Sequence, residues 1–205
     1  MPSITATGVH HLPSQGPYII SPNHQSYLDP LVLCAILPYE ILTQLFFVGA
    51  SEYFASPFTA WLAKQCNLVA VDPDANLVPA LKAAAFGLTH DKILMVFPEG
   101  ERSIDGTVKR FKKGAPILAR QLGVPIVPVA IRGVFDVWPR NRGINWRVLL
   151  PWRGHRVQVA FGAPMRIDRC ADDGDAAAAL RNRVAMMWEA LDRTREVPEG
   201  DPPRA

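Results

Sequence analysis

Short, continuous apolar runs recur along this chain, and each is followed by a polar loop and then by a segment with helical spacing. The clearest run, Ile93–Phe97, contains only apolar residues, as expected for a strand that is covered on both faces. Similar runs occur at Tyr18–Ile20 and Ile126–Ile131. Strands that alternate with helices build layered domains in which the sheet is largely parallel. We therefore predict an α/β fold: a single layered domain with a mixed, largely parallel central sheet flanked by helices.

The remaining elements are expected from the same patterns. The helix after the first strand begins either at Asp29, as the N-cap before Pro30, or at Ser26, with Asp29 in the first turn. Because proline cannot donate to a sheet ladder, Pro125 and Pro128 predict that their strand lies at an edge or starts there. We expect further strands at Leu45–Val48, Leu68–Val71 and Arg156–Phe161, and helices at Leu31–Leu37, Pro57–Gln65, Asn76–Leu88, Lys113–Leu122 and Ala176–Arg195.

The length of the chain, 205 residues, suits one domain with a sizeable core, and no linker separates a second one. The tail from Pro198, rich in proline and acid, is expected to be flexible. The best candidate for a membrane span, Pro30–Ala50, is interrupted by Pro38 and Glu40, so it falls short of the ~18 to 20 apolar residues that a span needs. Three widely spaced cysteines and an N-terminus without a signal-peptide pattern indicate a reducing cytoplasm.

Positive charge is concentrated in the second half of the chain. Between Arg102 and Arg156 there are twelve Lys or Arg residues and only two acids. Within this block the segment KRFKKG, residues 109–114, precedes a predicted helix, and its Lys112 and Lys113 are candidates for binding the phosphates of coenzyme A or an anionic bilayer surface. A solvated helix start is the alternative. The lack of interleaved aromatic residues beyond Phe111 argues against nucleic acid as a partner.

His24 and Asp29 are the candidate catalytic residues, because a histidine with an orienting carboxylate is suited to remove a proton at neutral pH. On a continuous helix, residues five apart point about 140° away from each other. The two side chains can therefore meet only if the chain bends between them. A capping aspartate with an incidental histidine is the alternative.

A second candidate block, FPEGERS at residues 97–103, follows the buried strand Ile93–Phe97. Ligands of open α/β sheets bind at the carboxyl ends of the strands, where this block falls. Gly100 allows close approach of a ligand to the backbone, and Arg102 is suited to bind a phosphate with two hydrogen bonds. A surface turn with a salt bridge is the alternative. The other histidines show no ligand spacing with Asp, Glu or Cys, so we predict no metal site.

In order and spacing, NHQSYLD (residues 23–29), FPEGERS (97–103) and VPIVPV (124–129) resemble the sequence blocks of the glycerolipid acyltransferase family, typified by 1-acylglycerol-3-phosphate O-acyltransferases. The resemblance runs from about Gly8 to Phe161. It implies an acyltransferase domain over residues 1–197, with 198–205 as a flexible C-terminal tail. The implied reaction moves a fatty acyl group from acyl-CoA or acyl carrier protein to a hydroxyl of a (lyso)glycerolipid, with no cofactor besides the donor.

The resemblance also assigns roles to residues. His24 and Asp29 match the catalytic pair, with His24 as general base and backbone N–H groups near the helix start stabilising the oxyanion. Glu99, Gly100 and Arg102 match the acceptor-binding block, and Pro128 with its neighbours matches the fourth block, either as part of an apolar groove for the acyl chain or as ordinary core. The predicted substrate-binding residues are Asn23, Glu99, Gly100, Arg102, Lys112, Lys113 and Pro128.

Two positions depart from the family pattern. Pro73 follows Val71-Asp72 where an Arg is usual, and Glu101 stands where Thr is usual. Both argue for an altered acceptor, such as a non-phosphatidate lysolipid or another amphiphilic alcohol. A non-catalytic lipid-binding module is a further alternative. We expect a cytoplasmic protein that associates peripherally with the membrane, through apolar contact from Phe46, Phe47, Tyr53, Phe54, Phe58 and Trp61 unless these side chains pack in the core.

Overall fold

One sheet, built from the apolar runs, organises the molecule. The computed structural model describes residues 3–50, 67–71, 78–150, 154–168 and 172–193, and within these ranges seven strands lie in the order β1-β7-β6-β2-β5-β3-β4. All neighbouring strands are parallel except β6 and β7, which are antiparallel. The strands are β1 (Ser3–Thr7), β2 (Tyr18–Pro22), β3 (Leu45–Ala50), β4 (Leu68–Val71), β5 (Ile93–Met95), β6 (Ile126–Arg132) and β7 (Arg156–Phe161).

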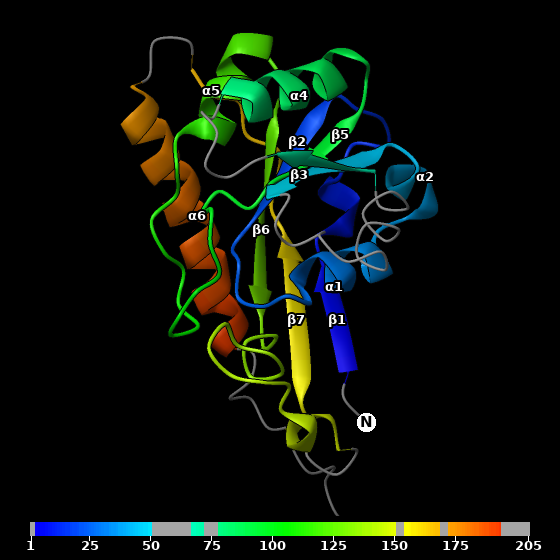
Figure 1. Cartoon of the computed structure of the whole chain (residues 1–205), viewed down its shortest axis with the longest axis vertical. Helices are drawn as coiled ribbons and strands as arrows, with labels where there is room; N and C mark the ends of the chain where they lie inside the picture. Colours follow the sequence, from blue (N-terminus) through cyan, green and yellow to red (C-terminus); the bar gives the residue numbers. More distant parts are fainter. Residues whose placement is uncertain (1–2, 51–66, 72–77, 151–153, 169–171, 194–205) are drawn as a thin grey trace, which may run out of the picture.

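Helices cover both faces of this sheet (Figure 1). One core cluster joins Leu33 of the first helix and Ile41 of the second to alternate side chains of the strands. The other joins Leu88, Leu118 and helix α6 to the opposite face. The helices are α1 (Asp29–Ile36), α2 (Tyr39–Leu42), α4 (Val78–Thr89), α5 (Gly114–Leu122) and α6 (Asp173–Arg193), with short 3₁₀ helices η1 (Val9–His11) and η3 (Trp146–Leu149). The predicted mixed, largely parallel α/β domain is confirmed.

The topology brings together loops that are far apart in sequence. Strand β2 pairs in parallel with β5 on one side and with β6 on the other. The three strands therefore end at the same edge of the sheet, where ligands of such sheets bind. The residues that follow β2 and β5 at this edge are Asn23-His24 and Phe97–Ser103, the two blocks singled out in the sequence.

The prediction that Pro128 marks an edge or the start of a strand is wrong, because β6 lies between β2 and β7 and Pro128 pairs with Ser21. The Ile126 amide faces β7, where it donates to the Met165 carbonyl at 2.8 Å. Groups two residues apart on a strand face the same way, so the missing N–H of Pro128 also faces β7. There the chain leaves the ladder between Phe161 and Met165. No hydrogen bond of the sheet is lost, and a central position is tolerated.

Other differences from the expected elements concern short or exposed segments. Strand β1 was not predicted, and all five of its residues are exposed. The predicted helix Pro57–Gln65, part of Asn76–Leu88, Pro73 and the tail lie outside the described residues. Among the aromatic residues proposed for membrane contact, Phe46 and Phe47 are buried core residues, and the other four lie outside the described residues. Within the described ranges, no helix has the length and apolar character needed to cross a bilayer.

The close approach of Pro128 to Gly162 makes a testable prediction. A Cβ at Gly162 would lie 2.8 Å from Pro128 Cγ and 3.0 Å from Met187 Sδ. The proline ring is fixed in the buried strand and cannot move away, so Gly162→Ala should lower the free energy of unfolding by ~1–3 kcal/mol. Denaturant unfolding measures this. Gly143→Ala is the matched control, since a Cβ there meets nothing within 4 Å. Equal stability of the two variants would contradict the packing described.

Candidate active site

The loop after β2 is tied to β6 by Asn23. The side-chain amide of Asn23 donates to the Ile131 carbonyl at 3.0 Å and accepts from the Ile131 N–H at 2.7 Å. Asn23 is fully buried. Its side chain thus extends the β2–β6 pairing where the β2 backbone turns away. Asn23 was predicted to bind substrate, but this geometry favours a positioning role, in which it sets the direction of the chain at His24.

The chain bends between His24 and Asp29, and the two side chains meet. His24 Nδ1 lies 2.8 Å from Asp29 Oδ2. The same oxygen accepts the backbone N–H groups of Gln25 at 2.6 Å and Ser26 at 2.8 Å. Three donors converge on one carboxylate oxygen, and this convergence closes the five-residue loop. Asp29 is fully buried, whereas 17% of the His24 side chain is exposed.

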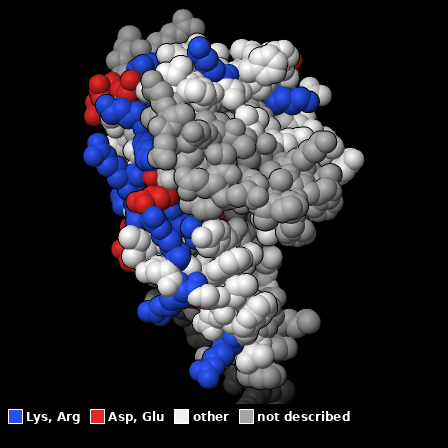
Figure 2. Space-filling model, in the orientation of Figure 1, with Lys and Arg blue, Asp and Glu red and all other residues white. Residues whose placement is uncertain are grey.

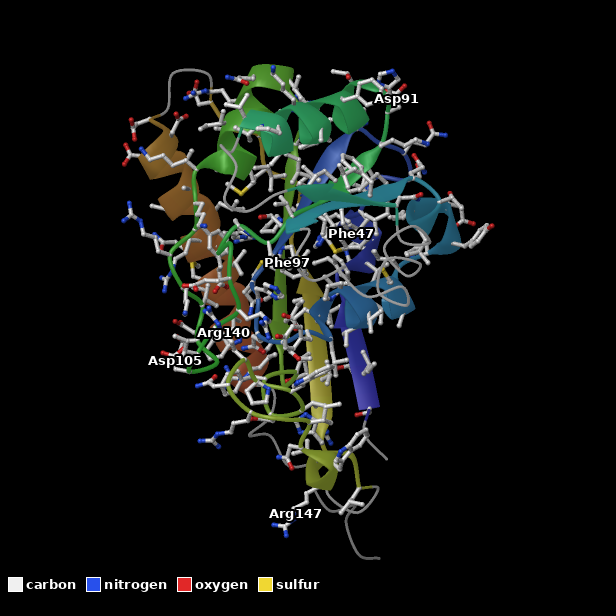
Figure 3. All side chains as sticks on the ribbon, in the orientation of Figure 1. Phe47, Asp91, Phe97, Asp105, Arg140 and Arg147 are labelled. Atoms are coloured by element: carbon white, nitrogen blue, oxygen red, sulfur yellow. The ribbon has the colours of Figure 1, made fainter. Side chains whose placement is uncertain are left out.

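This arrangement determines which ring nitrogen of His24 is available for chemistry. An ionised carboxylate can only accept, so Nδ1 carries the proton that is donated to Asp29. Nε2 is then left unprotonated and able to take a proton from a bound group. The ring is held from one side by Phe97, whose ring stacks on it with a centroid distance of 4.1 Å and an interplanar angle of 27°. Figure 3 shows Phe97 near the middle of the molecule.

Asp29 lies in the first turn of α1, as in the second of the two placements considered above, but the N-cap residue is Leu28 rather than Ser26. The Leu28 N–H donates to Ser26 Oγ at 3.2 Å, and Asp29 lies in the first turn. The Asp29 N–H donates to the Ser26 carbonyl at 3.3 Å. Together with the Gln25 and Ser26 amides on the Asp29 carboxylate, four N–H groups of this loop already have acceptors. The expectation that amides near the helix start stabilise an oxyanion is therefore not met by these four.

The bend after β5 is fastened to His24 on both sides of that residue. The His24 N–H donates to Glu99 Oε1 at 3.0 Å, and the His24 carbonyl accepts the Ser103 N–H at 2.8 Å. Glu99 is buried. Burial raises the pKa of Glu99 to about 7, although the backbone amides of His24 and Lys109 oppose the change. Glu99 is thus a positioning residue for the His24 backbone.

Gly100 and Lys112 form the next part of the bend. Gly100 has a φ of 73°, in the left-handed region that favours glycine. A Cβ there would lie 2.5 Å from both Cε and Nζ of Lys112. The Lys112 N–H donates to the Pro98 carbonyl at 2.7 Å, which holds the basic segment against the bend. The Lys112 ammonium is therefore placed beside the backbone of Gly100, next to the residue that contacts His24.

The side chain of Arg102 is buried, whereas that of the preceding Glu101 lies at the surface. The buried Arg102 guanidinium lies 3.3 Å from the centroid of the Tyr27 ring, inside the His24–Asp29 loop. The exposed Glu101 binds Arg140 and lies 3.6 Å from Lys109 Nζ. The hydrogen bond from Arg140 holds the pKa of Glu101 below its usual range, so the carboxylate stays charged. Arg140 also donates to the Arg102 carbonyl at 3.4 Å.

Two of the predicted substrate-binding residues lie elsewhere. Pro128 is buried, and its ring lies under Gly162 close to Met187 of α6, which corresponds to the core alternative. Lys113 lies near Gly174 at the start of α6. Sequence reasoning missed Tyr27, Arg140 and Trp138, whose carbonyl accepts the Ser26 hydroxyl at 2.8 Å. Tyr27 lies within a motif that was recognised, but the contribution of residues 138–140 carries no local signal in the sequence.

Known proteins share sequence with this chain. The sequence pattern of the Acyltransferase family matches residues 3–132. The chain is 34% identical over 192 residues to 1-acyl-sn-glycerol-3-phosphate acyltransferase alpha of Ovis aries and to the Homo sapiens protein of the same name, covering 90% of this chain. It is 27% identical over 184 residues to a 1-acyl-sn-glycerol-3-phosphate acyltransferase of Pseudomonas aeruginosa, which covers 88% of this chain and 65% of that protein. The chain spans 61% of the Ovis aries protein and 62% of the human one.

A solved structure shares the fold. The crystal structure of the 1-acyl-sn-glycerophosphate (LPA) acyltransferase PlsC from Thermotoga maritima superposes with a TM-score of 0.78 at 25% sequence identity. The match covers 93% of this chain and 73% of that chain. Among the described residues, no group of three or more His, Cys, Asp or Glu side chains is placed to hold a metal ion.

The buried Glu99 makes stability depend on pH. Its pKa is about 7 in the folded chain against 4.5 for an ordinary glutamate, so the folded state binds the proton more tightly. The contribution of Glu99 to the free energy of unfolding is then largest below pH 4.5 and is lost as the pH rises through 7, by up to about 3 kcal/mol. Glu99→Gln should remove this dependence, so the difference between variant and wild type should change between pH 5 and pH 8. Denaturant unfolding at both values measures it.

Glu40→Gln, at an exposed position, is the matched control for the loss of one carboxylate. Its stability should follow the wild-type protein at both pH values. A Glu99→Gln protein whose stability also runs parallel to the wild type would show that Glu99 is ionised at little cost.

Proposed function

Because this chain belongs to the acyltransferase family, we propose that it is an O-acyltransferase that moves a fatty acyl group from a thioester donor to the hydroxyl of a lysoglycerolipid. The relatives named above are 1-acyl-sn-glycerol-3-phosphate acyltransferases, and 1-acylglycerol 3-phosphate is the acceptor that we propose. The observation that carries the proposal is the contact of 2.8 Å between His24 Nδ1 and the buried Asp29 carboxylate. The reaction needs no cofactor besides the acyl donor, which is acyl-CoA or acyl carrier protein.

In the proposed reaction His24 Nε2 takes the proton of the acceptor hydroxyl as that oxygen attacks the thioester carbonyl. The new carbon–oxygen bond forms, the carbon–sulfur bond then breaks, and the imidazolium returns its proton to the departing thiolate. Asp29 stabilises the imidazolium between these two steps, as in the histidine–aspartate pair of serine hydrolases. The stacked Phe97 and the Glu99 contact keep the ring and the backbone of His24 in place during the transfer.

The acceptor phosphate is assigned to the bend after β5. Lys112 Nζ lies beside the positive-φ Gly100, and Arg102 lies over Tyr27. Arg102 thus belongs to the bend that is hydrogen bonded to His24, and Lys112 is held against that bend by its hydrogen bond to the Pro98 carbonyl. A lysolipid must be presented with its chain in a bilayer and its head group at this bend, so we propose that the protein works on the cytoplasmic surface of a membrane, as a peripheral protein.

Replacement of His24 tests the catalytic role. His24→Ala should lower kcat/KM about 10²- to 10⁴-fold, because the proton then has no base in position. Release of free thiol from acyl-CoA in the presence of 1-acylglycerol 3-phosphate measures the rate. His90→Ala, which removes an exposed histidine, should keep the wild-type rate. Near-normal turnover by a folded His24→Ala protein would sink the proposal, and unfolding curves of both variants show whether the fold is retained.

A second candidate acceptor is favoured by the contacts of Glu101. The Glu101 carboxylate already forms ion pairs with Arg140 and Lys109, next to the proposed phosphate site. An acceptor that carries a phosphate must compete with this fixed negative charge for the neighbouring cations. The contacts therefore favour a lysolipid or another amphiphilic alcohol with less negative charge, handled by the same His24–Asp29 pair.

Replacement of Glu101 by the family's usual residue separates the two acceptors. Glu101→Thr releases Arg140 and Lys109, so KM for 1-acylglycerol 3-phosphate should fall about two- to fivefold, within the range of exposed ion pairs. KM for an uncharged monoacylglycerol should not change. Asp91→Asn removes an equally exposed acid at a position with φ of 58° that asparagine also adopts, and should leave both constants unchanged. If KM for 1-acylglycerol 3-phosphate is the same in Glu101→Thr as in the wild type, Glu101 plays no part in acceptor choice.

A further inference from the structure

The two neighbouring lysines of the KRFKKG segment are directed to different places. Lys112 lies over Gly100 in the bend that contacts His24. Lys113 lies on the other side of the segment, where its Nζ is 3.7 Å from the position of a Cβ on Gly174. Lys113 precedes α5 and makes no capping hydrogen bond with its side chain. The basic segment therefore faces two sites, and only the first belongs to the acceptor bend.

The second site is a groove between this segment and α6. It has a volume of about 520 Å³, within the usual range of about 300–1,000 Å³ for small-molecule sites. Four cationic residues line it, and no acid is among the described residues that do so. The cations are Lys109, Arg110, Lys113 and Arg181. Figure 2 shows Lys and Arg gathered along the side of the molecule where α6 runs.

The floor of the groove is apolar and fixed. Phe111 and Val108 belong to the core beneath it, and Ala177 of α6 is buried beside them. Arg181 donates to the Val108 carbonyl at 3.0 Å, which ties α6 to the basic segment across the groove. An apolar floor surrounded by positive charges suits a ligand that joins a heterocycle to several phosphates.

We propose that this groove binds the adenosine 3′-phosphate 5′-diphosphate part of coenzyme A, and hence that acyl-CoA is the acyl donor. The assignment rests on the proposed acyl transfer, which requires a thioester donor. The purine ring lies on the floor formed by Phe111 and Ala177, and the phosphates pair with Arg110, Lys113 and Arg181. Guanidinium groups bind phosphate with two parallel hydrogen bonds, so two arginines at the groove favour this ligand.

The chain path connects the groove to the catalytic pair. Lys113 follows Lys112, and Lys112 lies against Gly100 with its N–H on the Pro98 carbonyl at 2.7 Å. Glu99, between Pro98 and Gly100, contacts the His24 N–H. These contacts form a continuous series from the basic segment, through Lys112 and Glu99, to His24. The pantetheine chain of coenzyme A is an extended arm, and it carries the thioester at its end.

A carrier protein or an anionic bilayer would also be attracted by the cations, but neither uses a hollow with an apolar floor. An acidic helix of a carrier protein needs an open surface, and a bilayer needs a flat one. Two carboxylates lie close to the rim. Glu101 is 3.6 Å from Lys109 Nζ. The pKa of Asp172 is lowered chiefly by the hydrogen bond from the Gly174 backbone amide and less by the charge of Lys113. Because Glu101 pairs with Lys109, the other three cations of the groove, Arg110, Lys113 and Arg181, are the ones assigned to the phosphates.

Binding of adenosine 3′,5′-bisphosphate alone tests the groove without any turnover. The double variant Arg110→Ala/Lys113→Ala should bind this probe at least about tenfold more weakly than the wild type in calorimetry, through the loss of two charged contacts. Arg147→Ala is the matched control, because Arg147 is exposed and lies at the far end of the molecule (Figure 3). It should bind the probe like the wild type. Equal binding by the double variant would overturn the proposal.

A truncated donor gives a second, independent measurement. Acyl-pantetheine lacks the nucleotide, so the advantage of acyl-CoA over it in kcat/KM should shrink about tenfold or more in the double variant. If the variant instead loses turnover only with acyl carrier protein, or loses only binding to anionic vesicles, the groove serves another partner and the proposal fails. Nucleotide binding that depends on Arg110 and Lys113 in a protein without thioester turnover would uphold the groove and sink the proposed function instead.

Discussion

The convergence of three donors on one oxygen of Asp29 is the interaction on which the rest of the site depends. Residues 24 and 29 would point away from each other on a helix, so the loop must be held closed against its own tendency to extend. The Gln25 and Ser26 amides do this by binding the same carboxylate oxygen that receives His24 Nδ1. The carboxylate that orients the histidine is therefore also the residue that folds the loop. Loss of its charge would remove the geometry and the electrostatic support of His24 together.

The sheet explains why blocks that are about seventy residues apart meet at this loop. Because β2 lies between β5 and β6 and is parallel to both, each of the three strands delivers its following loop to one edge. Asn23 then reaches Ile131 near the end of β6, and Glu99, in the loop after β5, reaches the His24 amide. In both contacts a polar side chain binds a backbone group: the Asn23 amide binds the backbone of β6, and the Glu99 carboxyl binds the backbone of His24. The strand order and these two contacts therefore position His24 without any contribution from a bound substrate.

Much of this could be predicted from sequence, and each failure has its own physical cause. Continuous apolar runs such as Ile93–Phe97 mark buried strands because burial on both faces leaves no room for polar residues. Strand β1 is fully exposed and so leaves no such pattern. Pro128 misled the prediction because the propensity argument assumes a complete ladder, and the ladder beside Pro128 is interrupted. The spacing of His24 and Asp29 was visible in the sequence, whereas the amides that fold their loop are backbone groups, which every residue carries.

Two buried carboxyl groups lie around His24, and their charges differ: Asp29 contacts the ring, and Glu99 contacts the backbone. Asp29 is fully buried and saturated with donors on Oδ2. Glu99 is also buried, but only one of its oxygens accepts the His24 amide, and burial raises its pKa to about 7. The buried Asp29 carboxylate also disfavours a second negative charge beside it, which adds to the rise in the pKa of Glu99. A Glu99 that is partly protonated near neutral pH keeps the hydrogen bond to His24 without imposing that second charge, so the loop can be fastened by a second carboxyl group.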